Sequence, residues 1–395
     1  MLESPRMPTH RLKIKEKRRE HPIQIVEPSD FESETAEEID PITILDSPAF
    51  SFYCFDKENE QAIFVECDDP VAVESAPFYY QAQYDHTISL ASMPLSMFHQ
   101  LAADIKMPPK GVLFIHSVGR CGSTLVSKAL AAVPQVHSLS EPDDLTQLTI
   151  LKVKEKASDE WVREALISSV RWRCKARVGN APEQVAIKTR SEVLVLADVF
   201  SDLFPDEKHF FLYRNAVSWM QSYFAGYGMD RDVYDKESNA ASEKGWAEVL
   251  PIIQEYHNES EPLNGIQIRV LAWITCMEGY LRMHGLKNLC AARFEDLTKE
   301  PIPMLKQLFE FCEIGQVDWE AIHEVLGRDS QAGTIFDREE RRKNHREMTL
   351  QMIQDVNDLV ATRPLLRKAD VVVERTIPSL PGSGAPVNTY PPFPS

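Results

Sequence analysis

The fold of this 395-residue chain is decided by the stretch Gly111-Val112-Leu113-Phe114-Ile115-His116-Ser117-Val118-Gly119-Arg120-Cys121-Gly122-Ser123-Thr124. Its first part, 112–115, is a continuous apolar run, which is typical of a parallel strand that is buried on both faces. Two glycines and then two hydroxyl side chains follow at an expected helix start. A strand that turns into a helix through such a loop offers backbone amides and a helix dipole to an anion. The segment therefore predicts a phosphate-binding loop.

Strand and helix patterns alternate after this loop. Strand-like runs are expected at 185–187, 209–213 and 289–293, and helical patterns at 192–204, 216–224, 266–283 and 301–311. Strands separated by helices predict an α/β fold, here a P-loop-type doubly wound sheet that is mainly parallel and flanked by helices. Ligands of such sheets bind at the carboxyl ends of the strands, so the loops of interest are 116–124, 188–191 and 214–222.

Four segments are expected along the chain. Residues 1–42 switch from a basic block to an acidic block with little periodic hydrophobicity, which predicts a disordered or loosely packed arm. Residues 43–105 contain short β-rich runs and predict a small N-terminal extension. The main domain is expected over 106–375. Residues 376–395 are rich in Pro, Gly and Ser and predict a flexible tail.

Composition narrows the class of function. The formal net charge of −17 argues against a general nucleic-acid binder or an anionic-membrane binder, because both would meet long-range repulsion. Neither an apolar signal core nor a run of about 18 apolar residues is found, so a cytoplasmic protein is the simplest interpretation, with an organelle-targeting peptide as the alternative for the basic start. The seven cysteines lack C-x-x-C spacing, which predicts neither a zinc site nor a disulfide framework.

The loop departs from the pattern of nucleotide hydrolases. A Walker A loop reads G-x-x-x-x-G-K-[ST], whereas Ser123 follows Gly122 in this chain. Without that lysine and without a clear Walker B acid, both ATP or GTP hydrolysis and a nucleotide kinase are disfavoured. Arg120 adds a fork of donors that suits phosphate or sulfate. On this motif alone, an ordinary strand-to-helix turn that binds no ligand is the alternative.

The loop resembles one found in the sulfotransferase family, whose members transfer a sulfuryl group from 3′-phosphoadenosine 5′-phosphosulfate (PAPS). The segment Gly119-Arg120-Cys121-Gly122-Ser123-Thr124-Leu125 looks like the family's 5′-phosphosulfate loop. Its form is that of the tyrosylprotein and carbohydrate branches, since the cytosolic small-molecule branch usually has Lys in place of Arg120. The resemblance implies that Gly119, Arg120, Cys121, Gly122, Ser123 and Thr124 bind the donor nucleotide.

Two further segments resemble the same family, in the family's order. The strand 209–213 ends at Arg214, and Ser222 follows eight positions later. The resemblance implies that this pair holds the 3′-phosphate of the nucleotide. The run Phe294-Glu295-Asp296-Leu297, with Pro301 beyond it, is similar to the family's Y-E-D-L-x-x-x-P segment. Phe294 replaces the usual Tyr, so an aromatic contact with the nucleotide is expected without the hydroxyl contact.

The family's closing R-K-G signature is absent, although the three matches cover about residues 111–315. Ser330 lies in a polar loop of the corresponding region, and we expect it to contact the nucleotide. The run Arg341-Arg342-Lys343 is a faint substitute for the signature, and its pattern favours a solvated helix face within 337–360.

Sulfuryl transfer needs a base for the acceptor's proton, in-line placement, and cations that neutralise the leaving nucleotide, and we expect no metal. The cytosolic branch has a His in a K-T-H segment where this chain has Lys188-Thr189-Arg190, and arginine cannot act as a base near neutral pH. The tyrosylprotein-type branch takes a Glu after the loop and its helix, which implies Glu141 as the general base. Arg120 and Lys188 then stabilise the sulfuryl group and the leaving phosphate, and Arg190 binds an acidic acceptor.

Structural alternatives stand beside each of these roles. Glu141 is also typical of an exposed carboxylate that caps the next helix, and Lys188 and Arg190 of a solvated strand end. His116 is a second candidate base, although a histidine at such a position is more often structural. A catalytically altered nucleotide- or anion-binding protein of the same fold is the competing function. The pattern predicts neither the oligomeric state nor whether the acceptor is a small molecule, a carbohydrate or a peptide.

Overall fold

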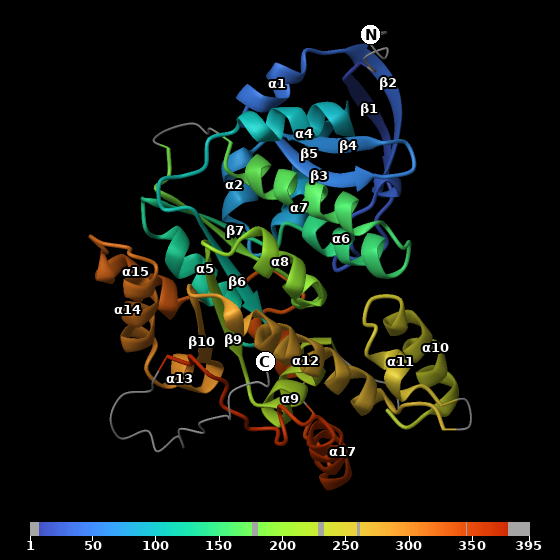
Figure 1. The fold of residues 1–395 in the computed structure, drawn as a ribbon, viewed down its shortest axis with the longest axis vertical. Helices are drawn as coiled ribbons and strands as arrows, with labels where there is room; N and C mark the ends of the chain where they lie inside the picture. Colours follow the sequence, from blue (N-terminus) through green and yellow to red (C-terminus); the bar gives the residue numbers. More distant parts are fainter. Residues whose placement is uncertain (1–7, 176–180, 228–232, 259–260, 345, 378–395) are drawn as a thin grey trace. The chain divides into compact units, whose positions relative to one another are not determined.

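The computed structural model (Figure 1) describes residues 8–175, 181–227, 233–258, 261–344 and 346–377. The chain forms two compact units. The first comprises Met1–Val112 and Pro134–Thr189, and the second comprises Leu113–Val133 and Arg190–Ser395. These units divide the chain differently from the four expected segments, and most of the expected tail, 378–395, lies outside the described residues.

An antiparallel sheet with the strand order β2-β1-β5-β4-β3 lies in the first unit. Its strands are β1 (His10–Lys17), β2 (Phe31–Glu38), β3 (Phe50–Asp56), β4 (Gln61–Cys67) and β5 (Thr87–Pro94). The helices of this unit are η1 (Pro28–Asp30), α1 (Pro41–Asp46), α2 (Pro70–Ser75), α3 (Tyr79–His86), α4 (Leu95–Asp104), α6 (Asp144–Val153) and α7 (Asp159–Arg173). Figure 1 shows α4, α6 and α7 beside this sheet. Phe98 of α4 and Trp172 of α7 both pack against Phe64 of β4.

The N-terminal arm differs from the expectation of a disordered or loosely packed segment, because its basic block forms β1 and its acidic block forms β2. Opposite charges lie across this antiparallel pair. Lys15 Nζ is 2.9 Å from Glu34 Oε2, and Arg11 Nε is 3.5 Å from Glu37 Oε1. Opposite charges that face each other across two strands favour their pairing. The basic and acidic blocks, whose charges suggested disorder, are therefore two strands of opposite charge that pair with each other.

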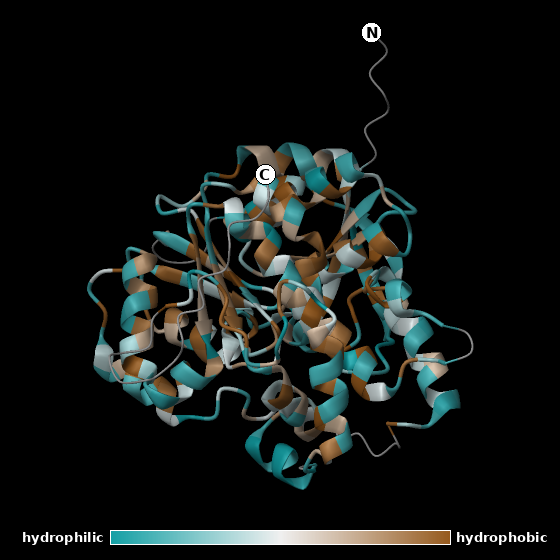
Figure 2. Cartoon of the chain, turned by 60° about the horizontal axis from the view of Figure 1, so that its bottom comes forward, coloured by the Kyte–Doolittle hydropathy of each residue, from teal (hydrophilic) through white to brown (hydrophobic). Residues whose placement is uncertain are grey.

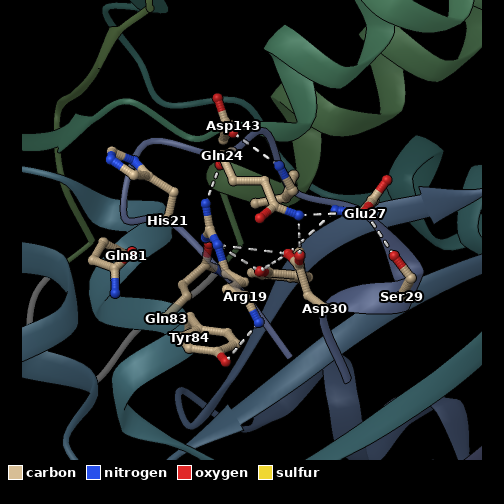
Figure 3. A network of polar contacts seen from close by, with 12 residues as sticks. Arg19, His21, Gln24, Glu27, Ser29, Asp30, Gln81, Gln83, Tyr84 and Asp143 are labelled. Atoms are coloured by element: carbon tan, nitrogen blue, oxygen red, sulfur yellow. Dashed lines mark hydrogen bonds and ion pairs between the residues drawn. The ribbon is translucent and has the colours of Figure 1, made fainter. Parts of the chain in front are cut away.

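A buried polar network fixes the connection between β1 and β2 (Figure 3). The side chains of Arg19 and Asp30 are 2% and 0% exposed, with 3.9 Å between Nε and Oδ2. The Tyr53 hydroxyl donates to Asp30, and the backbone N–H of Val26 donates to Asp143 at 3.0 Å. Burial raises the pKa of Asp30, against the lowering effects of the Tyr53 hydrogen bond and the Arg19 charge. These contacts tie the arm to the body of the first unit.

The second sheet has the strand order β10-β9-β6-β8-β7. Its strands are β6 (Val112–Ser117), β7 (Val136–Ser140), β8 (Gln184–Lys188), β9 (Lys208–Tyr213) and β10 (Leu289–Arg293). Within the second unit β6 pairs with β9 and β9 with β10 in parallel, and β7 pairs in parallel with β8 in the first unit. Every residue of β6 and of β8 is buried, as a strand covered on both faces requires. The predicted fold class, an α/β sheet with a small β-rich N-terminal part, is confirmed.

The helices of the second unit are α5 (Ser123–Ala131), η2 (Ser191–Leu196), α8 (Ala197–Leu203), α9 (Ala216–Tyr227), α10 (Lys236–Ala247), α11 (Ile253–Tyr256), α12 (Gly265–Arg282), η3 (Met283–Gly285), α13 (Phe294–Lys299), α14 (Pro301–Phe311), α15 (Trp319–Gly327), α16 (Arg338–Lys343) and α17 (Leu350–Ala361). Long helices of this unit bury apolar residues on one side, as α14 and α17 do. In Figure 2 many helices change between brown and teal along their length, as amphipathic helices do. Among the described residues, no helix is long and apolar enough to cross a bilayer.

Candidate functional site

The loop between β6 and α5 has a backbone that favours glycine. Gly119, Arg120 and Gly122 have positive φ angles of 71°, 52° and 85°. A Cβ atom at Gly122 would lie 3.0 Å from Leu297 and 3.4 Å from Phe294, so a side chain has no room there. Arg120 adopts the left-handed conformation although it carries a Cβ, which is uncommon and is often found at functional sites. The loop is thus held in a defined shape.

The N-terminus of α5 meets the requirements of an anion site. Ser123 and Thr124 are buried at the start of this helix, and Ser123 Oγ accepts a hydrogen bond of 3.3 Å from Ser117 Oγ. The N-cap is Gly122, which has no side chain that could occupy the first amides. Cys121 is buried, with its Sγ 3.2 Å from the carbonyl oxygen of Leu212 in β9. Cys121 therefore anchors the loop through its side chain, and the helix start offers its N–H groups and dipole to an anion.

Arg214, which follows strand β9, contacts both the phosphate loop and Phe294. Its Nε donates to Ser218 Oγ at 3.0 Å, and one of its Nη atoms donates to the carbonyl oxygen of Arg120 at 3.3 Å. Its Cζ lies 4.2 Å from the ring centroid of Phe294, which begins α13. A guanidinium at this distance makes a cation–π contact with the ring. The structure therefore brings together Arg120, Arg214 and Phe294, one residue from each of the three motifs.

The two predicted serines lie near this cluster. Ser222 is on α9, one turn beyond the Ser218 that bonds to Arg214. Ser330 is in the turn after α15, and its neighbour Gln331 accepts a hydrogen bond of 3.4 Å from Arg120 Nη1. The expected contacts of Ser222 and Ser330 with a nucleotide stay predictions.

Glu141 and Lys188 form an ion pair in the first unit. In the parallel register of β7 and β8, Ser140 lies opposite Lys188, and the N–H of Glu141 donates to the Lys188 carbonyl at 2.7 Å. The Lys188 ammonium donates to Glu141 Oε1, and the two side chains are 4% and 13% exposed. Glu141 has a positive φ of 64°. The alternatives of an exposed capping carboxylate and a solvated strand-end lysine are therefore wrong for this pair.

The family model of the sulfotransferase domain matches residues 110–359, which include the loop, Arg214, Phe294 and the Glu141–Lys188 pair. This chain belongs to the sulfotransferase family. Similar solved structures include a sulfotransferase from Alicyclobacillus acidocaldarius, with 14% identity, 67% of this chain and 96% of that chain covered, and a TM-score of 0.38. A search of curated proteins finds no match.

Two structures with bound molecules are also similar to this sulfotransferase. The first is a mouse sulfotransferase in complex with PAP, with 14% identity, 67% of this chain and 88% of that chain covered, and a TM-score of 0.35. The second is a retinol dehydratase in complex with androsterone and PAP, with 11% identity, 82% of this chain and 98% of that chain covered, and a TM-score of 0.34.

Arg190 of this sulfotransferase is not a solvated side chain. Its Nε lies 3.9 Å from Glu192 Oε2, and both side chains are largely buried. Glu192 also accepts a hydrogen bond of 3.1 Å from Ser191 Oγ. That hydroxyl would lie 3.6 Å from a Cβ atom at Gly119, so the Ser191–Glu192 pair borders the phosphate loop. Neither Ser191 nor Glu192 was predicted from the sequence, although both follow directly on the Lys188-Thr189-Arg190 segment.

Helix α9 supports the loop through a residue that the sequence analysis also missed. Trp219 Nε1 is 2.9 Å from the carbonyl oxygen of Val118 and 3.1 Å from that of Gly119, and it donates to both. Asn215 caps the helix by accepting from the N–H groups of Val217 and Ser218. An Asn directly before an apolar helix is a typical N-cap signal, and it fixes where α9 begins.

His116 has the structural role that its position favoured. It is buried, and its Nε2 lies 3.3 Å from Nδ1 of His209. The second ring nitrogen of His209 lies 3.0 Å from the carbonyl oxygen of Phe204. Burial, reinforced by the His209 ring, lowers the pKa of His116 well below its usual value. A buried histidine that is engaged by its neighbour does not suit the role of the base.

Proposed function

We propose that this sulfotransferase moves a sulfuryl group from PAPS to a hydroxyl or amine acceptor by in-line transfer, with Glu141 as the general base. Membership of the family supports sulfuryl transfer in general. The observation that carries the choice of donor is the contact of Arg214 with both the Arg120 carbonyl and the Phe294 ring. These contacts support the choice of donor, because a nucleotide with a 3′-phosphate needs a second cation near the loop that we propose for its 5′-phosphate.

The donor is bound in two parts in this proposal. The loop amides, Ser123 and Thr124 hold the 5′-phosphosulfate, because a helix N-terminus favours an anion. Arg214, with Ser222 and Ser330, holds the 3′-phosphate, and Phe294 packs beside the nucleotide. We assign no metal to the reaction, since arginine and lysine supply the positive charge at the leaving phosphate.

The chemical step uses the Glu141–Lys188 pair. In the resting enzyme the ammonium of Lys188 orients the Glu141 carboxylate. When PAPS binds, Lys188 moves to the oxygen that bridges sulfur and phosphorus, and Glu141 takes the proton of the acceptor hydroxyl or amine. The acceptor atom bonds to sulfur as the bond between sulfur and the bridging oxygen breaks. Arg120 and Lys188 neutralise the charge that develops on the departing 3′,5′-bisphosphate, PAP.

The combination of Arg120 in the loop and Glu141 after it places this chain, in our proposal, with the tyrosylprotein and carbohydrate branches. The acceptor in this proposal is a small molecule, a carbohydrate or a peptide. Arg190 binds an acidic group of the acceptor, which has to compete with Glu192 for the guanidinium. This competition predicts that acidic acceptors bind more tightly to a Glu192→Gln variant.

The donor assignment is tested by calorimetry with PAP and ADP. PAP carries a 5′-monophosphate and ADP a 5′-diphosphate, and only PAP carries the 3′-phosphate that Arg214 is proposed to bind. We expect PAP to bind about 10-fold or more tightly than ADP, since a charge-assisted hydrogen bond contributes ~1.5–3 kcal/mol. An Arg214→Gln variant should lose most of this preference. Equal affinities of the natural protein for PAP and ADP would refute the donor assignment.

The base assignment is tested with Glu141→Gln in PAPS-dependent transfer to 4-nitrophenol, a tyrosine peptide and an amino sugar. We expect PAP binding to persist and transfer to fall about 100-fold or more. Glu155→Gln removes an exposed carboxylate of the same unit and serves as the control. Near-normal transfer by Glu141→Gln would remove Glu141 from the mechanism. PAP binding without transfer by the natural protein would instead favour the catalytically altered binding protein.

A further inference from the structure

The guanidinium of Arg120 lies in a slot on helix α9. A Cβ atom at Gly226 would be 2.9 Å from Arg120 Cζ and 3.0 Å from its Nε and one Nη, so only a glycine leaves room at this point of the helix. The ring centroid of Phe336 is 4.6 Å from the same Cζ, which is a cation–π distance. The tip of Arg120 thus packs against the backbone of α9 and against an aromatic ring.

Among the described residues, packing and one hydrogen bond hold the Arg120 guanidinium, and no ion pair does. Gln331 Oε1 accepts from Nη1 at 3.4 Å, while Nε is buried and has no hydrogen-bond partner in the described part of the chain. Nor do the described residues offer it a carboxylate within ion-pair distance. Burial lowers the pKa of Arg120, and the charges of Arg341 and Arg214 act in the same direction. A half-satisfied buried cation is unfavourable in isolation, so its charge is available to an anionic ligand.

One face of α9 organises both this slot and the loop. Trp219 bonds to two loop carbonyls, as described above. Tyr223 and Tyr227 follow at helical spacing with their rings stacked at 4.4 Å, and the Tyr227 ring meets Phe336 edge-on at 5.0 Å. Residues four apart share a helix face, so Trp219, the two tyrosines and Gly226 form a continuous support. This support sets the position of the Arg120 tip relative to its own backbone.

We infer that Gly226 and Phe336 are positioning residues, which aim the guanidinium of Arg120 at the sulfuryl end of the donor. The inference rests on the proposed function, in which Arg120 stabilises the transferring group. Gly226 acts by having no side chain, and Phe336 acts by covering the cation with an aromatic face. Packing of this kind fixes the direction of the guanidinium without neutralising it, whereas a carboxylate partner would compete with the donor.

The decisive variant is Gly226→Ala, studied by calorimetric titration of PAPS. The added methyl group collides with the far end of a flexible side chain, so the guanidinium has to move while the helix is retained. Alanine also has the higher helix propensity, so we expect no loss of thermal stability. PAPS affinity should fall about 10-fold, as expected when a charge-assisted contact is misplaced. Gly245→Ala on α10, where a Cβ meets nothing within 4 Å, is the matched control and should bind PAPS normally.

A double-mutant cycle separates this inference from the function on which it rests. Gly226→Ala should weaken PAPS binding in the natural background and have no effect beside Arg120→Ala. Weaker binding by Arg120→Ala together with normal binding by Gly226→Ala would overturn the positioning role alone. If Arg120→Ala binds PAPS normally, or the natural protein binds none, the proposed role of Arg120 fails and the inference fails with it.

The contribution of Phe336 is tested by a conservative pair of variants. Phe336→Tyr keeps an aromatic face over the guanidinium and should retain the natural affinity for PAPS. Phe336→Leu keeps apolar bulk without the aromatic face and should weaken binding several-fold, because the cation–π contact is lost. Equal affinities of these two variants would contradict the role of the ring.

Discussion

Acid should destabilise the second unit through the buried pair of histidines beneath the phosphate loop. His116 and His209 are 1% and 0% exposed, and their rings stack. The carbonyl oxygen of Phe204 can only accept, so His209 carries its proton on Nε2 and its Nδ1 accepts from Nε2–H of His116. A proton added to Nδ1 of His209 would face the N–H of its neighbour. Burial favours the neutral form of both rings, because it lowers the pKa of each.

The size of the effect follows from the pKa of His209, which burial lowers to about 4. The usual pKa of histidine in an unfolded chain is about 6.5. Between these two values the unfolded chain binds a proton that the folded chain excludes. The stabilisation is thus complete above about pH 6.5 and is lost as the pH falls toward about 4. At ~1.4 kcal/mol per pH unit, the loss reaches about 3 kcal/mol for this group.

Urea unfolding between about pH 7 and about pH 4 tests this value. We compare the natural protein with His209→Phe, whose ring can stack on Phe114 as the imidazole does at 5.1 Å. The variant loses hydrogen bonds and should be less stable than the natural protein at neutral pH. On acidification, however, its free energy of unfolding should fall less than that of the natural protein, by a difference of up to about 3 kcal/mol. His323→Gln, which removes an exposed histidine of α15, is the control. Parallel pH curves for His209→Phe and the natural protein would refute the reasoning.

Two further predictions concern the site. Lys188→Met leaves the largely buried Glu141 without its cation, so we expect the free energy of unfolding in urea to fall by about 3–5 kcal/mol. Adding Glu141→Gln to this variant should restore most of the lost stability. An equal loss of stability in Lys188→Met and in the double variant would contradict the ion pair. Trp219→Phe keeps an aromatic ring and removes the N–H that donates to the loop carbonyls. We expect the free energy of unfolding to fall by ~1–3 kcal/mol and PAPS to bind more weakly in calorimetry. An unchanged PAPS affinity would show that the loop does not need this hydrogen bond.

The parallel sheet could be predicted from the sequence because its signals are local. A strand covered on both faces needs a continuous apolar run, and the run at 112–115 lies within β6. Helix α14 begins and ends at the predicted residues, because Pro301 at its first position cannot lie in the helix interior without breaking it. The 192–204 pattern is likewise helical, although its first turn and a half is a 3-10 helix. The spacing of apolar residues shows which face of a strand or helix is buried, and this is sufficient to predict where the strands and helices lie.

The N-terminal arm could not be predicted in this way, because its stability depends on pairing partners. A run of like charges is usually solvated, and each block taken alone has that pattern. The blocks become strands because β1 meets both β2 and β5, which supply opposite charges and a sheet edge. The buried contact of Arg19 with Asp30 and Tyr53 likewise joins residues far apart in sequence. The local sequence pattern does not show which distant residues will become such partners.

The same distinction applies within the site. Arg120 could be identified from the sequence because an arginine within a glycine-containing loop is a local feature. The residues that position its guanidinium, however, come from α9 and from the segment before α16. One sign of them was nevertheless present. A glycine inside a helix is unfavourable by ~1 kcal/mol relative to alanine, so Gly226, which follows aromatic residues spaced for one helix face, calls for a reason in packing. The structure supplies that reason in the Arg120 guanidinium, since no other residue type would leave the slot open.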